Sequence, residues 1–329
     1  MMDYESTVTV SQYSSLLTIA IPTFNRPSNL IICIDSILTQ IEKNVNILIS
    51  DNSTNNVTED LIKERFSGNS LIGYIKNEQN IGPDANFLQC LRLSKGRFTL
   101  ILGDDDVLVP GALKEIVSTL EANLNAPLIF LNHKTWGGYI GARKHNGVPI
   151  NNNLFISQVA YALTYVSALV FNTTFFREIE RPERFFGSML LQTNLVMEIL
   201  GRHDGAIITK NYCVSAQALQ GAFGSYDVYG VFASNWKAIL KHSYLNGHIT
   251  YFTMRRAFSK TIFPFLTKMT ILFRQDDDLT NFISSRKILF KATNTYFFSW
   301  LLLYPATLIP SKLMTYINRF ISHYSRVRK

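Results

Sequence analysis

The chain has 329 residues, of which 47% are hydrophobic and 17% are charged, and its formal net charge is +8. This length suffices for one large domain with an extension, and for a sizeable buried core. The three cysteines, Cys33, Cys90 and Cys213, are isolated in the sequence and form neither a zinc-binding spacing nor a disulfide framework. Because the first residues also lack the apolar core of a signal peptide, we expect a protein of the reducing cytoplasm.

Apolar runs alternate with helix-like patterns through the first hundred residues. The run Leu16–Ile21 contains β-branched residues and is stopped by Pro22, so it predicts a buried strand that feeds a loop. Apolar side chains then recur on one face of a predicted helix at residues 28–38. Further strands are predicted at residues 45–50, 72–75 and 98–102, and further helices at 59–66 and 87–93. Strands that alternate with helices in this way are typical of a parallel α/β sheet.

Three consecutive carboxylates follow the last of these strands. Asp104, Asp105 and Asp106 come soon after the apolar run Phe98–Leu102, where carboxylates repel one another and lose solvation. A cation among them would make the arrangement favourable, and hard oxygen ligands suit Mg²⁺ or Mn²⁺ ions that share a substrate's phosphates. The carboxyl ends of strands are also where open α/β sheets bind ligands. An ordinary acidic turn is the alternative, since a Pro-Gly pair follows at residues 110–111.

Four short motifs follow one another in a characteristic order and spacing. They are Ile19–Arg26, Ser50–Ser53, Asn80–Gly82 and Gly103–Asp106. With these motifs the chain resembles the family 2 glycosyltransferases of the GT-A fold, and within that family the bacterial O-antigen and capsule enzymes of the abequosyltransferase-like type. The resemblance is strong over roughly residues 16–135 and continues weakly to about residue 240.

The resemblance implies a fold and a domain organisation. The fold would be α/β, with a Rossmann-like, mostly parallel sheet that carries helices on both faces. A GT-A domain would occupy residues 1–240, with a nucleotide-sugar half at about 16–135 and an acceptor half at about 136–240. A helical, basic and aromatic extension would occupy residues 241–329. In the acceptor half, the patterns predict a helix at 154–163, a strand at 165–171 and a helix at 187–200.

The same resemblance implies roles for individual residues. The loop from Pro22 to Arg26 would lie beside the nucleotide, and Asp51 would accept a hydrogen bond from its base. Within the family's Asp-x-Asp motif, Asp104 would lie near the ribose, while Asp106 would hold Mn²⁺ or Mg²⁺ on the diphosphate. The nucleotide-sugar site would contain Pro22, Thr23, Asn25, Arg26, Asp51, Asn80, Gly82, Asp104 and Asp105, and the metal site Asp106 and Asp104. The alternatives are a turn or helix cap for Asp51 and a surface charge for Arg26.

The catalytic base is the point at which the sequence departs from the family. Many members carry an Asp or Glu near the start of the helix predicted here at 187–200, but residues 185–188 are Phe-Phe-Gly-Ser. The nearest carboxylate is Glu183, which is our candidate base. Its alternative is a surface residue paired with neighbouring arginines. Asp204, after the helix, is a weaker candidate.

The basic residues are concentrated in the last quarter of the chain. Residues 241–329 hold 14 Lys and Arg but 3 Asp and Glu, whereas residues 1–240 hold 18 and 21. The aromatic, apolar run Thr295–Pro310 is too short for an ordinary membrane span and is interrupted by Pro305. We expect it to lie at an anionic membrane surface, which would place the protein on the inner face of the cytoplasmic membrane. A helical bundle packed on the catalytic domain is the alternative, and no motif supports nucleic-acid binding.

The resemblance implies a metal-dependent glycosyltransferase. It would move a sugar, with a deoxyhexose favoured, from a nucleotide-diphosphate donor to a polyprenol-linked oligosaccharide acceptor in O-antigen or capsule synthesis. A metal that neutralises the diphosphate leaving group fits the residue types. One alternative is a nucleotidyltransferase, although the glycine-rich basic loop usual in that class is replaced here by Pro22-Thr23-Phe24-Asn25. The other is a non-catalytic relative that binds saccharide.

Overall fold

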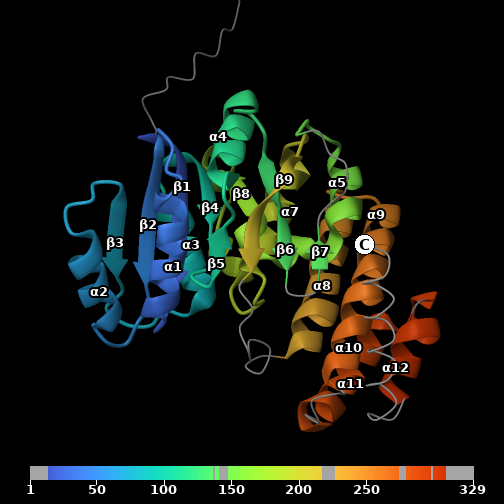
Figure 1. Ribbon diagram of the computed structural model, residues 1–329. Helices are drawn as coiled ribbons and strands as arrows, with labels where there is room; N and C mark the ends of the chain where they lie inside the picture. Colours follow the sequence, from blue (N-terminus) through green and yellow to red (C-terminus); the bar gives the residue numbers. More distant parts are fainter. Residues whose placement is uncertain are drawn as a thin grey trace, which may run out of the picture.

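The computed structural model describes residues 14–135, 138–140, 147–216, 227–273, 279–297 and 299–308. Its strands form a nine-stranded sheet in the order β3-β2-β1-β4-β8-β6-β9-β5, and β7 pairs with β6 (Figure 1). The strands are β1 (Ser15–Thr23), β2 (Val45–Asp51), β3 (Ile72–Lys76), β4 (Gly96–Ile101), β5 (Asp106–Leu108), β6 (Leu128–Thr135), β7 (Gly138–Ile140), β8 (Leu169–Asn172) and β9 (Ile207–Ala216).

The first four strands of the chain form a parallel half-sheet. β1 lies between β2 and β4 and is parallel to both, and β3 is parallel to β2. Parallel neighbours need crossover connections, and these are the helices α1 (Pro27–Leu38), α2 (Val57–Phe66) and α3 (Pro83–Leu93). The alternating strands and helices expected for this half are confirmed. As a consequence, the loops that follow β1, β2 and β4 meet at one edge of the sheet.

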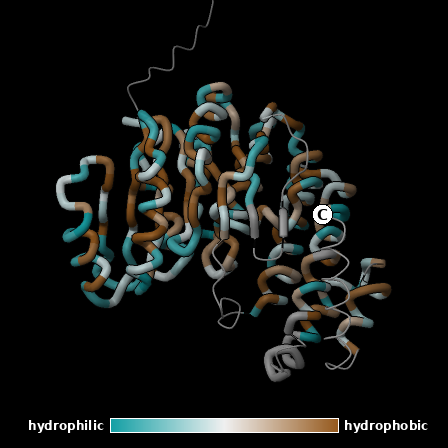
Figure 2. Tube along the Cα trace, in the orientation of Figure 1, coloured by the Kyte–Doolittle hydropathy of each residue, from teal (hydrophilic) through white to brown (hydrophobic). Residues whose placement is uncertain are grey.

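Helices cover both faces of the sheet, as expected. Ile19 of β1 belongs to an apolar cluster with Leu30 of α1, whereas its neighbour Ala20 packs in a separate cluster with Cys90 of α3. This reversal follows from the two-residue period of a strand. Figure 2 shows the hydrophobic positions concentrated along the strands of this half. The remaining helices before the last strand are α4 (Ala112–Ala122), α5 (Asn152–Val159), α6 (Thr173–Arg177) and α7 (Leu191–Arg202).

The parallel pairing that we expected extends over the first four strands and also joins β6 to β9, whereas the other pairings of the second half are antiparallel. β8 is antiparallel to both β4 and β6, and β5 is antiparallel to β9. The strand expected at 165–171 is shorter, because Val166–Ala168 form the 3₁₀ turn η3 and β8 begins at Leu169. The Gly103 N–H, beyond the carboxyl end of β4, donates to Ser167 Oγ in that turn. The chain therefore enters β8 beside the end of β4 and has to run back along it.

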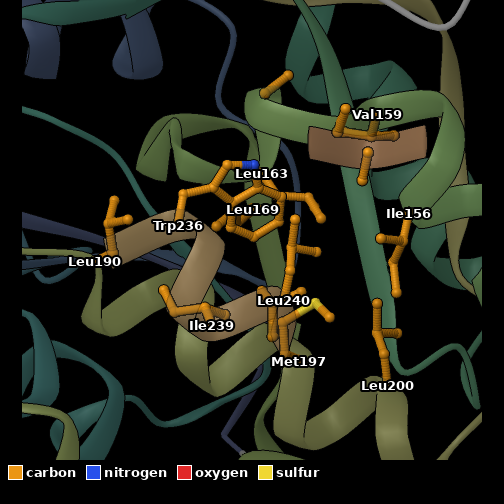
Figure 3. Close-up of a cluster of buried hydrophobic side chains, with 14 of the residues drawn as sticks. Ile156, Val159, Leu163, Leu169, Leu190, Met197, Leu200, Trp236, Ile239 and Leu240 are labelled. Carbon is orange, nitrogen blue, oxygen red and sulfur yellow. The ribbon is translucent and has the colours of Figure 1, made fainter. Parts of the chain in front are cut away.

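Helices follow the last strand and lie beside one end of the sheet (Figure 1). They are α8 (Trp236–Leu245), α9 (Tyr251–Lys260), α10 (Thr267–Phe273), α11 (Leu279–Thr293) and α12 (Tyr304–Leu308). The fully buried Trp236 donates its indole N–H to Thr261 Oγ1 at 2.9 Å and packs among Leu163, Leu169 and Met197 (Figure 3). The helices that follow the last strand thus share one apolar core with β8 and α7.

The division of the chain at residue 240 stays a proposal. α8 runs across that position, and one apolar cluster contains both Leu88 of α3 and Leu303 near the end of the described chain. Residues 309–329 of the expected extension lie outside the described residues. In the ranges that the structure describes, every helix is too short or too polar to span a bilayer.

Candidate active site

The first and fourth motifs meet at the carboxyl ends of two neighbouring parallel strands. Thr23 is the last residue of β1, and the acidic turn follows β4. The Thr23 hydroxyl donates to Asp104 Oδ2 at 2.7 Å. Arg26 Nη1 donates to Asp104 Oδ1 at 3.3 Å and to Asp105 Oδ2 at 3.1 Å. The strand pairing therefore brings residues about eighty positions apart into one polar cluster.

Burial makes this cluster electrostatically costly. Asp104 and Asp106 are each 5% exposed. Burial raises the pKa of Asp104 to about 6 and that of Asp106 to about 7, and the neighbouring carboxylates add to both shifts. Hydrogen bonds from Thr23 and Arg26 act in the opposite direction on Asp104. A cation placed between these side chains would offset both the lost solvation and the repulsion.

The donor set fits a hard divalent cation that keeps other ligands. Asp104 and Asp106 offer carboxylate oxygens, which suit Mg²⁺ or Mn²⁺ ions that also bind water and substrate phosphates. Among the described residues, no group of three or more His, Cys, Asp or Glu side chains is arranged to hold a metal on its own.

The second motif places Asp51 at the end of β2. Asp51 is fully buried, and its two carboxylate oxygens accept hydrogen bonds from the Ser53 N–H at 2.8 Å and from the Tyr74 hydroxyl at 2.6 Å. Burial raises the pKa of Tyr74, and the hydrogen bond to Asp51 and the charge of that carboxylate raise it further. The predicted bond to a nucleotide base would use a remaining lone pair of this carboxylate. Tyr74 was not among the predicted site residues.

The remaining motif residues join the same edge of the sheet. Asn52 Oδ1 accepts from the Ile81 N–H at 3.3 Å, and Asn52 Nδ2 donates to the Gly82 carbonyl at 3.3 Å. Asn80 Oδ1 accepts from the Gly82 N–H at 2.9 Å, and Gly82 has a φ of 84°, which favours glycine. The Asn25 N–H donates to Ser53 Oγ at 2.9 Å.

Main-chain pairing also joins the first motif to the second, because Pro22 lies opposite Ser50 in the β1–β2 register. All four motifs are therefore connected at one edge of the sheet.

Glu183 lies in the short helix η4 (Pro182–Phe185) and is ion-paired with Arg92 of α3. Its side chain is 43% exposed, and the hydrogen bond from Arg92 lowers its pKa. A second carboxylate contacts the start of the segment that was expected to carry the base. Asp84, at the start of α3, accepts a hydrogen bond from the Gly187 N–H at 2.8 Å, and burial raises its pKa. Asp84 thereby connects the third motif to the loop before α7.

Comparison with known proteins identifies the family. Residues 18–177 match the family model described as glycosyl transferase family 2. These residues belong to that family. Abequosyltransferase RfbV of Salmonella typhimurium is 36% identical over 110 residues, which are 32% of this chain and 33% of that protein. The GalNAc(5)-diNAcBac-PP-undecaprenol beta-1,3-glucosyltransferase of Campylobacter jejuni is 32% identical over 102 residues, 31% of this chain and 33% of that protein. The chain thus spans about a third of the length of these two curated relatives.

Solved structures extend the likeness of the fold further along the chain. Residues 1–349 of Staphylococcus aureus TarS, in complex with UDP-GlcNAc, align with a TM-score of 0.60 and 16% identity. The alignment covers 84% of this chain and 79% of that one. Mannosyltransferase PcManGT from Pyrobaculum calidifontis, with GDP-Man and Mn²⁺, has a TM-score of 0.50 and 15% identity over 74% of this chain and 73% of that one. The architecture of this chain is that of the GT-A glycosyltransferases.

Proposed function

We propose that the chain transfers a sugar, with a deoxyhexose favoured, from a nucleoside-diphosphate donor to a polyprenol-linked saccharide in the synthesis of a bacterial surface polysaccharide, and that the reaction requires Mn²⁺ or Mg²⁺. The observation that carries the proposal is the buried acidic turn, which is contacted by Thr23 and Arg26 at the carboxyl ends of β1 and β4. The names of the relatives support the substrate classes: the Campylobacter enzyme acts on an undecaprenol-linked saccharide, and TarS is complexed with UDP-GlcNAc.

Each residue of the cluster has a role in this proposal. Asp106 and Asp104 hold the cation, which supplies Lewis-acid stabilisation of the diphosphate leaving group. Asp104 also lies at the ribose, and Asp105 assists either contact. Arg26 is about half exposed at its side chain, so its guanidinium is free to turn from the carboxylates to a diphosphate oxygen. The nucleotide lies along Pro22, Thr23, Asn25, Asp51, Asn80 and Gly82.

Glu183 is the proposed base that takes the proton of the acceptor hydroxyl. The lowered pKa of Glu183 makes it a weaker base than an unpaired glutamate. A general base works best when its pKa lies near the operating pH. Catalysis by Glu183 therefore requires that the acceptor displace Arg92 from the carboxylate. The ion pair is half exposed on both sides, so water and substrate reach it.

The proposed location is the inner face of the cytoplasmic membrane, where polyprenol-linked acceptors are available. Large apolar side chains are exposed on the C-terminal helices and turns: Phe252 is 67% exposed, Phe297 71%, Trp300 56% and Leu308 67%. Basic residues, including Arg255 and Arg256 of α9, lie in the same part of the chain. Aromatic side chains with adjacent cationic groups suit an anionic lipid surface.

Product analysis tests the proposed reaction. The purified protein is incubated with Mn²⁺, a panel of UDP-, CDP-, GDP- and dTDP-sugars and extracted polyprenol-linked saccharides. We expect one donor to yield an extended lipid-linked product and free nucleoside diphosphate, and Asp106→Asn to yield neither. Release of pyrophosphate would instead support a nucleotidyltransferase. Binding of saccharide without turnover of any donor would support a non-catalytic relative.

A further inference from the structure

A hydroxyl from the second half of the sheet is bonded to the acidic turn. Ser167, fully buried in η3, donates its hydroxyl to Asp106 Oδ2 at 2.5 Å. The same Ser167 Oγ accepts the Gly103 N–H at 2.9 Å. Ser167 thus joins the first residue of the acidic turn to its last carboxylate. Because β8 continues from η3 and pairs with β4, the sheet itself fixes the position of this serine (Figure 1).

The phenol of Tyr165 lies beside the same carboxylate. Burial, followed by the charge of Asp106, raises the pKa of Tyr165 well above its ordinary value. Its hydroxyl is buried and has no partner at hydrogen-bonding geometry in the described part of the chain. The ring packs on His133 of β6, with 4.5 Å between ring centroids. A buried hydroxyl that makes no hydrogen bond lowers the stability of the fold. The Tyr165 hydroxyl would gain a hydrogen bond if a small movement of Asp106 brought a carboxylate oxygen to it.

The turn leaves little space for any other arrangement. A Cβ atom at Gly103 would lie 3.0 Å from Asp105 Oδ1, 3.1 Å from Asp106 Oδ2 and 3.3 Å from Ser167 Oγ. A side chain at that position would therefore press on the Asp106 carboxylate and on its hydrogen bond to Ser167. The glycine allows the serine, the main chain and the carboxylate to approach one another closely.

We propose that Ser167 and Tyr165 are positioning residues for Asp106. Resting on the proposed function, the inference is that the Ser167 hydroxyl, joined by the Tyr165 hydroxyl after a small movement of Asp106, holds one carboxylate oxygen and leaves the other to the divalent cation of the donor complex. A buried carboxylate fixed by hydrogen bonds is preorganised, because it does not have to reorient when a cation binds. Loss of such a hydrogen bond behind a metal ligand typically weakens metal binding by about 10- to 100-fold.

Mn²⁺ titration separates this role from a general structural one. Free Mn²⁺ is followed by electron paramagnetic resonance in the presence of UDP, CDP, GDP or dTDP in turn. We expect Ser167→Ala to weaken Mn²⁺ binding by about 10- to 100-fold, and Tyr165→Phe to weaken it by less, while the affinity for nucleotide in EDTA stays that of the wild type. Ser94→Ala is the matched control, because Ser94 is a buried serine hydrogen-bonded to Thr99 near the amino end of β4. It should leave Mn²⁺ affinity unchanged.

The outcomes distinguish the inference from the proposal on which it rests. If the wild type binds Mn²⁺ with none of the nucleotides, metal dependence itself is wrong, and the inference is overturned with it. If the wild type binds Mn²⁺ and Ser167→Ala binds it equally well, the positioning role alone is wrong. Should Ser167→Ala fail to fold, Tyr165→Phe decides, because it keeps the packing ring and removes only the hydroxyl. Equal losses in Ser167→Ala and Ser94→Ala would also refute a specific role.

Discussion

Asp106 is predicted to lower the stability of the metal-free protein when it ionises. Its folded pKa of about 7 lies above the value of about 3.9 for an aspartate in an unfolded chain. The folded state therefore binds the proton more tightly than the unfolded state does. The resulting penalty is absent below about pH 4, grows between about pH 4 and pH 7, and is complete above pH 7. Asp106→Asn removes the ionisable group and keeps the shape of the side chain.

The magnitude follows from the gap between the two pKa values. A gap of roughly three units, at 1.36 kcal/mol per unit, amounts to about 4 kcal/mol at pH 8. The asparagine amide can still form a hydrogen bond with Ser167 Oγ, so most of this penalty should be recovered. We expect the variant to be more stable than the wild type by about 2–4 kcal/mol at pH 8, which corresponds to a rise in Tm of roughly 3–6 °C for a chain of this size.

Thermal and urea unfolding in EDTA at pH 8 and at pH 4.5 measure the effect. The stability advantage of Asp106→Asn should shrink to a small fraction at pH 4.5, where the wild-type carboxyl is protonated in the folded state. Asp35→Asn is the control, since Asp35 is an exposed carboxylate paired with Arg65 and should change stability by less than about 1 kcal/mol. An advantage that is absent at pH 8, or equal at both pH values, would refute the reasoning.

Three further predictions concern the base, the nucleotide and the membrane. Glu183→Gln should lower kcat by about 100-fold or more with donor affinity unchanged, whereas Arg92→Gln should keep kcat within about threefold; near-normal turnover of the first would refute the assignment. Tyr74→Phe removes a hydrogen bond to Asp51 and should weaken nucleotide binding about fivefold in calorimetry, and unchanged affinity would contradict a role at the base. Trp300→Ser should reduce sedimentation with anionic liposomes, whereas the control Val57→Ser, at an exposed position of α2, should not. Equally low binding of the wild type to anionic and neutral liposomes would contradict the proposed membrane contact.

The first four strands and their connecting helices could be predicted because their sequence signals are local. Leu16–Ile21 and Val45–Ser50 are short apolar runs, each ended by polar loop residues, and the intervening helix shows its own periodicity. Once these strands are taken as parallel, their carboxyl ends have to meet, and this brings Thr23 to Asp104 without any knowledge of side-chain positions. The residues of the four motifs themselves were found through their resemblance to the motifs of the family 2 glycosyltransferases.

The residues that the sequence analysis missed lie in segments without such a signal. Ser167 is 61 residues from Asp106, and its position depends on a 3₁₀ turn and an antiparallel strand where the pattern predicted one longer strand from Tyr165. An apolar run in a sequence does not show whether the strand is parallel or antiparallel to its neighbours. The contact between Ser167 and Asp106 therefore could not be inferred. Tyr74 lies in the short strand β3 among residues that are at least partly exposed, and nothing in its neighbours indicates a bond to Asp51.

The charge of the acidic turn connects its structure to its proposed chemistry. Three aspartates and Arg26 carry a formal charge of −2 when ionised. Burial, and to a lesser extent the repulsion of the neighbouring carboxylates, raises the pKa of Asp104 and of Asp106. A nucleoside diphosphate brings further negative charge to the same edge of the sheet, so its binding without a cation would increase the repulsion. A divalent ion shared between protein and diphosphate offsets both. Metal and donor should therefore bind cooperatively, since each removes the electrostatic cost that opposes the other.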